Sequence, residues 1–494
     1  MKLQFLAVDL GVSGGQTLIG TLNEDDNVKV ETLTRFPLDT VSIGNHIFWN
    51  LPHIYLEIEK ALSIVASRGI KLTSIGIDSW GADFVCFGED GYPLANPLSF
   101  HDPCTAGEPS RFFAEKISAE KVYDITGQQA MNYNSLFQLS AMQRANNSAL
   151  AAARRIMFLP DALSFLLCGM EVTEYTIASS SQLLNPKSRR IDPALLEALN
   201  LPTDIFPPIV MPGTVIGRLS SHVSRRTGMP QIPVVAVAGH DIASAIAAIP
   251  ADGHRFAFLR SGLRSIMGIE LPDPVIDDDS CVANFSNQAG AESSSLLIKH
   301  LCGLSILERC RNEWQRDGKP TDYDSLLKAS LSVNESGKSL IAPEAPEFAN
   351  PTSMIDAIRQ YCRASGQGVP ESQGKIVDCI LVSLAMRYRQ VLSMLRHFAP
   401  FDIDTLHIIG KGSIIDRLNR LTADILQIRV IAGPAENTST GNLMLQAKAA
   451  GRVRSLDEIR TLIRHSAKVK EYAPDPSTAQ RWDSIYSRFN SLPK

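Results

Sequence analysis

The sequence has no long uninterrupted run of apolar residues, no excess of positive charge and few cysteines. No apolar run approaches the ~20 residues that a helix needs to cross a bilayer, and Met1–Phe5 lack the features of a secretory signal. Lysine and arginine total 48 against 52 acidic residues, a formal net charge of -4, which argues against nonspecific binding of nucleic acid or anionic lipid. Eight cysteines in 494 residues are too sparse for a disulfide scaffold. We therefore expect a cytoplasmic protein with no nucleic-acid or membrane partner.

The chain does contain ample apolar material, arranged in two similar series of strands and helices. Apolar residues make up 44% of the sequence, and 494 residues suffice for two or three domains. The first series predicts a helix near 56–65 and strands at 3–10, 17–22, 28–34, 74–78 and 84–87. The second predicts helices at 375–397 and 416–426 and strands at 255–260, 265–270, 405–409 and 428–432. This recurrence indicates a duplicated α/β architecture with a cleft between the halves, where ligands usually bind.

Further helices are predicted outside the two series. Residues 150–159 and 160–167 have helical patterns. In the tail, Pro476-Ser477 resembles a helix start, and an apolar stripe follows it, formed by Trp482, Ile485, Tyr486 and Phe489. The stripe predicts a terminal helix that docks on a core.

A carboxylate followed by a glycine-rich turn ends the first predicted strand, in Asp9-Leu10-Gly11-Val12-Ser13-Gly14-Gly15. Such a turn lets backbone N–H groups approach a phosphate, and the Asp9 carboxylate is suited to Mg²⁺. Taken alone, an Asp before a glycine-rich hairpin is more often an ordinary turn. Both interpretations stay open on this motif.

A second motif, Gly239-His240-Asp241, lies between an apolar stretch and a predicted helix at 242–249. Asp241 is therefore expected at a helix N-terminus, where the helix dipole favours its ionised form and keeps it available as a proton acceptor. A plain capping aspartate fits the same pattern. Two more glycine turns, Arg260-Ser261-Gly262 and Gly410-Lys411-Gly412, follow strands of the second series.

Taken together, the motifs resemble the FGGY carbohydrate kinases, and within that family most closely the rhamnulokinases. The resemblance runs in order over about nine-tenths of the chain. Its matching segments are Ala7-Val8-Asp9-Leu10-Gly11, Gly76 to Val85, Tyr133 to Leu139, Glu174-Tyr175-Thr176, Gly239 to Asp241 with Ala243-Ser244-Ala245, Asn350-Pro351 with Ser353-Met354, and Gly433 to Glu436 with Gly441-Asn442.

The resemblance implies two actin-like ATPase domains of the ribonuclease H-like α/β class, with an interdomain cleft that holds a sugar and ATP. We place an N-terminal sugar-binding domain at 1–245, a nucleotide-binding domain at 246–455 and a helical tail at 456–494. The implied reaction moves the γ-phosphate of ATP, with Mg²⁺, to a hydroxyl of a ketose such as L-rhamnulose. The implied assembly is a monomer or a homodimer.

The resemblance also implies roles for single residues. Asp241 takes the position of the catalytic base, and Asp9 that of the residue facing the metal. The implied sugar contacts are Gly81, His240, Asp241, Trp80 and Asp83. The implied nucleotide contacts are Ser13, Gly14, Gly15, Gln16, Gly262, Leu263, His300, Gly410, Lys411 and Gly412. Cys362 and Cys379 occupy positions that can pair in relatives, although a cytoplasmic setting favours free thiols.

The departures from the family pattern gather on the nucleotide side. The first phosphate loop ends in Gln16 where a basic residue is usual, and Gly262 is followed by Leu263, which cannot hydrogen-bond a phosphate oxygen. Further changes are His300 for Asn, Glu308 for Gln, the shortened glycine run at 410–412, and the missing arginines of 101–104. Two hypotheses follow. One is a working kinase in which Arg260, Arg264 or Lys411 supplies the lost charge, and the other is a pseudokinase that acts as a sugar sensor or regulatory subunit.

Overall fold

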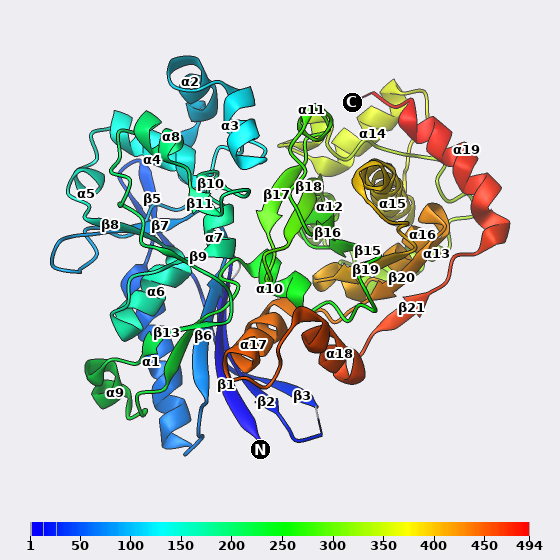
Figure 1. Cartoon of the computed structure of the whole chain (residues 1–494). Helices are drawn as coiled ribbons and strands as arrows, with labels where there is room; N and C mark the ends of the chain where they lie inside the picture. Colours follow the sequence, from blue (N-terminus) through cyan, green and yellow to red (C-terminus); the bar gives the residue numbers. More distant parts are fainter. Residues whose placement is uncertain (1, 13, 26, 494) are drawn as a thin grey trace. The chain divides into compact units, whose positions relative to one another are not determined.

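The computed structural model describes residues 2–12, 14–25 and 27–493, which form two compact units (Figure 1). Unit 1 contains residues 1–252, 270–297 and 437–466, and unit 2 contains residues 253–269, 298–436 and 467–494. Each unit is therefore assembled from three separate stretches of chain. The C-terminal tail is divided between them, because residues up to Ser466 belong to unit 1 and later residues belong to unit 2.

A six-stranded sheet forms the centre of unit 1, in the order β13-β14-β6-β1-β2-β3. Its strands are β1 (Leu3–Gly11), β2 (Gly14–Leu22), β3 (Val28–Phe36), β6 (Ser74–Ser79), β13 (Thr214–Arg218) and β14 (Pro233–Ala236). β1, β2 and β3 pair antiparallel, whereas β6 lies parallel to both β1 and β14. The consecutive buried residues of β1 and β6 fit strands that are covered on both faces. The strands predicted at 3–10, 17–22, 28–34 and 74–78 are confirmed.

A group of helices packs on this sheet or on other members of the group. They are α1 (Leu51–Ser67), α6 (Leu159–Cys168), α9 (Ser221–Thr227), α10 (Asp241–Ala247), α17 (Asn437–Ala449) and α18 (Leu456–Ser466). The Asn50 side chain caps α1 by accepting a hydrogen bond from the backbone N–H of His53 at 3.2 Å. α17 packs against β1, β6 and α10. The helices predicted near 56–65 and 160–167, and the helix after Asp241, are confirmed.

The remainder of unit 1 surrounds a second apolar cluster. Its elements are β4 (Thr40–Ile43), β5 (His46–Trp49), β7 (Phe84–Phe87), β8 (Arg155–Phe158), β9 (Thr173–Glu174), β10 (Leu184–Asn185), β11 (Arg190–Ile191), β12 (Ile209–Val210), β17 (Ser286–Ala289), η1 (Pro103–Thr105), α2 (Glu108–Glu115), α3 (Ala119–Thr126), α4 (Ser135–Arg144), α5 (Ser148–Ala151), α7 (Tyr175–Ser179), α8 (Pro193–Ala198) and α11 (Asp278–Val282).

Two expectations fail in this part of the chain. The helix predicted at 150–159 is wrong, because α5 ends at Ala151 and Arg155–Phe158 form strand β8. The strand predicted at 84–87 exists as β7, but it pairs antiparallel with β8 in a separate two-stranded sheet and does not extend the central one. Both errors share a cause, since a short apolar run does not reveal whether it will pair with a distant strand.

Unit 2 is centred on a sheet in the order β17-β18-β16-β15-β19-β20-β21, of which β17 and the ends of β16 and β18 belong to unit 1. Its other strands are β15 (Phe256–Arg260), β16 (Arg264–Leu271), β18 (Ser295–Cys302), β19 (Thr405–Ile409), β20 (Arg429–Ala432) and β21 (Lys470–Tyr472). The helical elements are α12 (Ser305–Arg316), α13 (Tyr323–Leu331), η2 (Pro346–Phe348), α14 (Met354–Ala364), α15 (Gln373–Phe398), η3 (Lys411–Ile414), α16 (Asp416–Leu426), η4 (Pro476–Thr478) and α19 (Ala479–Asn490). The predicted second series is confirmed, with ends that differ by at most two residues.

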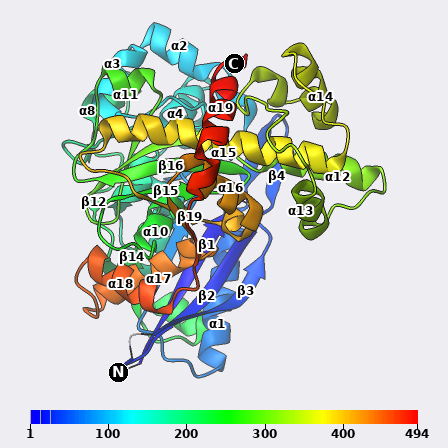
Figure 2. The same ribbon diagram turned by 90° about the vertical axis from the view of Figure 1, so that its right-hand side faces the viewer.

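The last helix, α19, docks on α15 and α16 as its apolar stripe predicts (Figure 2). Trp482, Ile485 and Phe489 are buried, and the Arg389 guanidinium lies 4.4 Å from the ring centre of Tyr486. Cys362 and Cys379, in the same unit, are buried free thiols.

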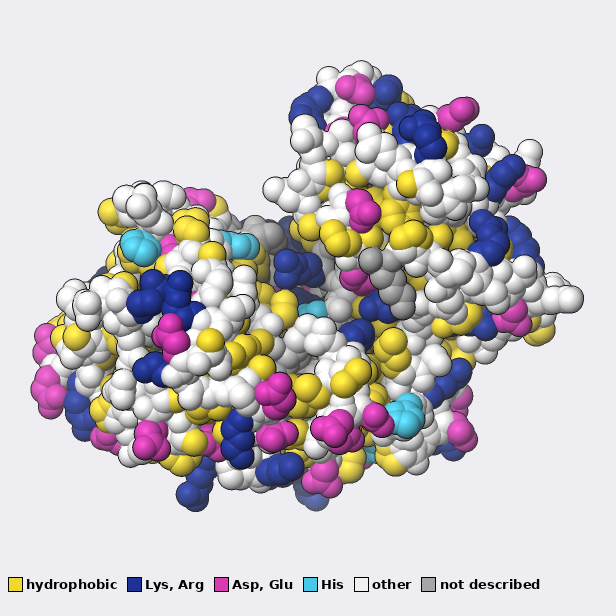
Figure 3. All heavy atoms as spheres, turned by 90° about the horizontal axis from the view of Figure 1, so that it is seen from above, with side chains coloured by type: hydrophobic (Ala, Val, Ile, Leu, Met, Phe, Trp, Pro, Cys, Tyr) yellow, Lys and Arg dark blue, Asp and Glu magenta, His cyan; other side chains and the backbone are white. Residues whose placement is uncertain are grey.

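The surface agrees with the balanced charge of the sequence. On the face drawn in Figure 3, acidic and basic side chains are interspersed. Among the described helices, none combines the length and the apolar character that a bilayer crossing requires.

Candidate functional site

The loop Gly239-His240-Asp241 joins β14 to α10 in unit 1. Asp241 is the first residue of α10, as predicted, and is only 7% exposed. Its Oδ1 atom lies 3.7 Å from Nε2 of His240. An acidic group is therefore held beside an imidazole, in a largely buried position at the end of a strand.

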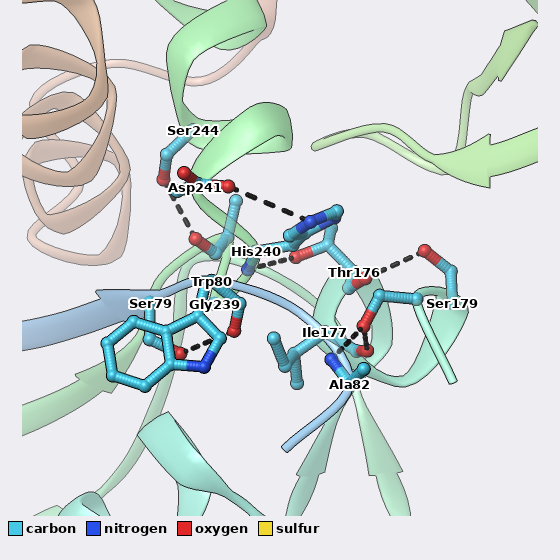
Figure 4. Close-up of polar contacts among 12 residues, drawn as sticks. Ser79, Trp80, Ala82, Thr176, Ile177, Ser179, Gly239, His240, Asp241 and Ser244 are labelled. Carbon is cyan, nitrogen blue, oxygen red and sulfur yellow. Dashed lines mark hydrogen bonds and ion pairs between the residues drawn. The ribbon is translucent and has the colours of Figure 1, made fainter. Parts of the chain in front are cut away.

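Hydrogen bonds from two other segments fix this loop (Figure 4). The backbone N–H of Gly239 donates to Oε2 of Glu174 at 2.9 Å, and the backbone N–H of His240 donates to the Thr176 hydroxyl at 3.2 Å. That hydroxyl donates in turn to Oε2 of Glu174 at 2.6 Å. On the other side, the backbone N–H of Ser79 donates to the Gly239 carbonyl at 2.8 Å. The position of Asp241 is therefore set by Glu174, Thr176 and the end of β6.

Glu174 also caps α7, because its carboxylate accepts hydrogen bonds from the backbone N–H groups of Thr176 and Ile177. Burial is the largest influence on this group, and it raises the pKa of Glu174 from 4.5 to about 7 despite these donors. Burial, together with the negative charge of Glu174, also holds the pKa of Asp161 well above its ordinary value. Glu174, with Asp161 close to it, therefore supports the loop that presents Asp241.

The raised pKa of Glu174 predicts a pH-dependent stability. Between pH 4.5 and about 7 the folded state binds this proton more tightly than the unfolded state, so its contribution to stability falls as the pH rises through that window. The loss amounts to about 3 kcal/mol for a shift of this size. Urea unfolding of the wild type and of Glu174→Gln, from pH 4.5 to 8, measures the effect. The wild type should lose stability across this window relative to the variant, and parallel curves would contradict the assignment.

The segment Trp80-Gly81-Ala82 lies close to His240. A Cβ added at Gly81 would lie 2.6 Å from Cβ of Ser180 and 3.1 Å from Nε2 of His240, so only glycine fits there. Ala82 has a left-handed backbone with a φ of 77°, which is costly for a residue other than glycine. Hydrogen bonds hold it, since its N–H donates to the Ser180 hydroxyl at 3.0 Å and its carbonyl accepts from the Ser135 hydroxyl at 2.6 Å. Strain of this kind is common where a protein positions a ligand.

Asp83 is fully buried and organises an aromatic cluster. Its Oδ2 atom accepts hydrogen bonds from the indole N–H groups of Trp49 and Trp80, at 2.6 and 2.8 Å, and from the backbone N–H of Phe100 at 3.3 Å. Its Oδ1 atom accepts from the Gln138 amide at 2.9 Å. Burial is again the largest influence, and it raises the pKa of Asp83 to about 6. The Asp83 carboxylate therefore holds the two indole rings in place.

Asp9 lies at the end of β1, near the N-terminal end of α17. Its Oδ2 atom accepts hydrogen bonds from the Ser439 hydroxyl at 2.5 Å and from the Gln16 amide at 3.1 Å. Asp78 of β6 is its partner in register, which places a second carboxylate on the neighbouring strand. Gln16, which replaces the usual basic residue, thus contacts Asp9 directly. Gly14 and Gly15 begin β2, and Ser13 lies outside the described residues.

In unit 2, the two predicted glycine turns lie side by side at the ends of the parallel strands β15 and β19. The backbone N–H of Ser261 donates to the Ile409 carbonyl at 2.9 Å, and that of Gly412 donates to the Ser261 carbonyl at 3.0 Å. Close packing requires glycine at 412, where a Cβ would lie 1.9 Å from the Ser261 hydroxyl. Gly410 has a φ of 79°, which also favours glycine. Sequence reasoning predicted the turns but not their direct contact.

The substituted residues of unit 2 occupy different settings. Leu263 is 60% exposed and follows directly on Gly262. His300 lies on β18. Glu308 lies on α12, where it forms hydrogen bonds with Arg311 at 2.7 Å and with the Tyr323 hydroxyl. Glu308 is therefore held by its own neighbours in unit 2.

One group of side chains has the composition of a metal site. Donor atoms of His46, Asp102 and Cys104 lie within 4.8 Å of one another, and the described part of the chain holds no other such group. The Asp102 carboxylate already accepts hydrogen bonds from the backbone N–H groups of Ile47 and Cys104. Burial raises the pKa of the Cys104 thiol to about 12, with Asp102 adding to the effect. The arrangement is better explained as the cap of η1 than as a metal site.

Several supporting residues could not be assigned a role from sequence. Glu174 and Thr176 were visible only as part of a matching segment, because glutamate is not among the residues favoured at a helix N-cap. The hydrogen bonds of Ser180 to Ala82 and of Ser439 to Asp9 join positions 98 and 430 residues apart. No local pattern indicates contacts at that separation.

Comparison with known proteins places these features in a family. Residues 4–247 match the N-terminal domain of the FGGY family of carbohydrate kinases, and residues 261–450 match its C-terminal domain. Curated relatives include a rhamnulokinase of Bacteroides thetaiotaomicron, 46% identical over 99% of both chains. Another, from Pectobacterium carotovorum, is 37% identical over 95% of this chain and 92% of its own length, and is also a rhamnulokinase.

Solved structures show the same fold at low sequence identity. A ligand-bound xylulose kinase from Lactobacillus acidophilus has a TM-score of 0.83 at 15% identity and covers 99% of this chain and 97% of its own. A Plasmodium falciparum glycerol kinase with ADP has a TM-score of 0.81 at 15% identity and covers 99% of this chain and 98% of its own. The predicted two-domain actin-like α/β fold is confirmed.

Proposed function

Because the chain belongs to the FGGY family of carbohydrate kinases, we propose that it transfers the γ-phosphate of ATP to a hydroxyl of L-rhamnulose or a related deoxyketose. Sugar kinase activity follows from the family. The sugar is inferred from the rhamnulokinases that align with the chain from end to end. These alignments lend no support to the pseudokinase hypothesis.

One observation carries the proposed mechanism, the fixed and largely buried Asp241 carboxylate. A base must lie within hydrogen-bond reach of the hydroxyl whose proton it accepts. The bonds from Gly239 and His240 to Glu174 and Thr176 hold the loop that presents Asp241. Asp241 accepts the proton of the attacking sugar hydroxyl, and His240, 3.7 Å away, binds the sugar beside it.

The remaining sugar contacts come from the strained segment after β6. Gly81 leaves room next to His240 that any other residue would fill. Trp80 is only 4% exposed, and its ring centre lies 4.4 Å from that of Trp49, so we assign it the role of supporting the Gly81 segment. Asp83 acts through Trp80, since its carboxylate is fully engaged in orienting the two indoles, and we assign it a positioning role instead of direct sugar contact.

The nucleotide residues are compatible with ATP and Mg²⁺. Asp9 and its register partner Asp78 provide carboxylate oxygens, which are the ligands that Mg²⁺ prefers. When bound, ATP would supply the phosphoryl group, and Mg²⁺ would neutralise part of the negative charge on the phosphates. Gly14, Gly15 and Gln16 in unit 1 would face the phosphates. The unit 2 contacts would come from Gly262, Leu263, His300, Gly410, Lys411 and Gly412.

We propose that Lys411 contributes positive charge to the bound nucleotide. It is exposed in the turn between Gly410 and Gly412, next to Ser261. Lys411→Ala should raise the KM for ATP about tenfold, because a charge-assisted hydrogen bond contributes roughly 1.5–3 kcal/mol. The KM for sugar should stay unchanged. Lys328→Ala, an exposed lysine on α13, is the matched control. Equal ATP dependence in both variants would assign the charge elsewhere.

A thermal-shift panel followed by turnover tests the function itself. L-rhamnulose, L-fuculose, D-xylulose and glycerol are each combined with and without ATP and Mg²⁺, since a ligand that binds the folded state raises its apparent stability. We expect stabilisation by ATP–Mg²⁺ and by a deoxyketose, and ADP release with that ketose. Stabilisation by sugar alone with no ADP release would support the sensor hypothesis and overturn the kinase.

A further inference from the structure

A cavity of about 300 Å³ lies within unit 1, and its lining contains none of Asp241, His240, Gly81 or Asp9. Its walls come from α7, from the turn between β10 and β11, and from the β17 region, which Figure 1 shows together. All of its lining residues belong to unit 1. The volume is at the lower end of the range for small-molecule sites.

One lining residue carries a buried hydrogen-bonding atom that the fold does not use. Gln288 is 8% exposed, and its side-chain oxygen Oε1 is buried without a hydrogen-bond partner among the described residues. Neighbouring polar groups are already engaged. Asn287 bonds to the backbone of Gly127 and Val275, and the Ser179 hydroxyl bonds to Thr176 and Ala289. An unused buried acceptor is costly and calls for a donor such as a hydroxyl group.

The rim of the cavity is positively charged. Lys187 and Arg189 lie on the turn between β10 and β11, and neither forms an ion pair with a described carboxylate. Asp273 is the one acidic residue of the described lining, so the lining carries a net charge of +1. Two lining cations without a carboxylate partner favour an anion.

The backbone on both sides of the mouth is strained. Arg189 and Ser293 have positive φ angles of 57° and 65°, which residues other than glycine rarely adopt. Nη2 of Arg189 donates to the Ser293 carbonyl at 3.4 Å, so the two strained lining residues are in contact. Strained residues that persist in a fold cluster at ligand clamps.

We propose that this cavity is a second binding site, separate from the transfer site, for a small anion that carries hydroxyl groups. Arg189 and Lys187 bind the anionic group, and Gln288 accepts a hydrogen bond from a hydroxyl. A sugar phosphate and a sugar acid share this chemistry. This ligand would be bound in addition to the sugar and nucleotide of the proposed kinase reaction. Its binding does not require that reaction.

Isothermal titration of the full chain tests the proposal with four probes, namely glucose 6-phosphate, gluconate, inorganic phosphate and neutral glucose. We expect glucose 6-phosphate to bind if the natural ligand is a sugar phosphate, and gluconate to bind if it is a sugar acid. Neutral glucose should not bind. Arg189→Ala should weaken that binding at least tenfold. Arg190→Ala, the adjacent exposed arginine outside the lining, should leave it within twofold. Equal losses in both variants, or no binding of either anion, would overturn the proposal.

A second pair of variants separates this site from the transfer site. Gln288→Leu removes the unused acceptor without leaving a partner unpaired, so the fold should persist while the affinity for the hydroxylated anion falls several-fold and that for inorganic phosphate does not. Asp241→Asn should leave anion affinity unchanged even if it abolishes turnover. Loss of anion binding in Asp241→Asn, with retention in Arg189→Ala, would place the anion in the transfer site and overturn the second site. Failure of the kinase assay alone would leave this result untouched.

Discussion

Asp241→Asn is expected to lower turnover about a thousandfold, while the affinity for the sugar stays within a few-fold of the wild type. General base catalysis typically contributes 10²- to 10⁴-fold, and an amide cannot accept the proton of the attacking hydroxyl. Asparagine keeps the size and shape of the side chain at the first position of α10, so the fold and the sugar contacts should persist. The measurement is ADP release for kcat, with titration calorimetry for the sugar.

Asp124→Asn is the control for this prediction, because Asp124 is exposed on α3 in the same unit. It makes the same chemical change away from the loop and should keep full activity. Retained turnover in Asp241→Asn would remove Asp241 from the role of base. Loss of sugar affinity together with turnover would instead assign it to sugar binding alone.

The elements that the sequence predicted well are those whose apolar pattern is complete within the element. β1 and β6 are examples, since each is a short stretch buried almost throughout, and α16 is another, since its buried residues recur at helix spacing. The stretch 150–159 failed because its last residues are an apolar run whose pairing with Phe84–Phe87 decides its conformation. Local periodicity does not contain that information.

In the site, too, the sequence revealed features that depend on neighbouring residues and missed those that depend on distant ones. Asp241 could be placed at a helix start because glycine, a short loop and an apolar helix surround it in sequence. Its supports could not be found in this way, since Glu174 is 65 residues from Gly239. Asp83 shows the converse, because its type and place suggest a sugar contact, whereas four donors from other segments engage its carboxylate. The residue type therefore indicates what a side chain can do chemically, but its burial and its partners determine whether it can contact a ligand.

Gly441→Ala is expected to have the largest effect on stability, and to reduce catalysis from a position outside the site. Gly441 lies on α17 where that helix packs against α10, and an added Cβ would lie 1.8 Å from the backbone carbonyl oxygen of Ser244. A backbone atom cannot rotate away as a side chain does, so one helix must move. Overpacking typically costs 1–3 kcal/mol, and we expect about 3 kcal/mol or more here. Because α10 begins at Asp241, its displacement should also lower kcat.

Gly20→Ala provides the comparison, because its added Cβ would meet the same helix but only the end of the Leu443 side chain, at 2.5 Å. That side chain can change rotamer, so the loss of stability should be smaller and kcat should be kept. Urea unfolding and ADP release on both variants measure the two effects. If Gly441→Ala were as stable and as active as Gly20→Ala, the packing of α17 on α10 would not be what holds Asp241 in place. A loss of stability in Gly441→Ala with normal kcat in the folded fraction would show that Glu174 and Thr176 position Asp241 without help from α17.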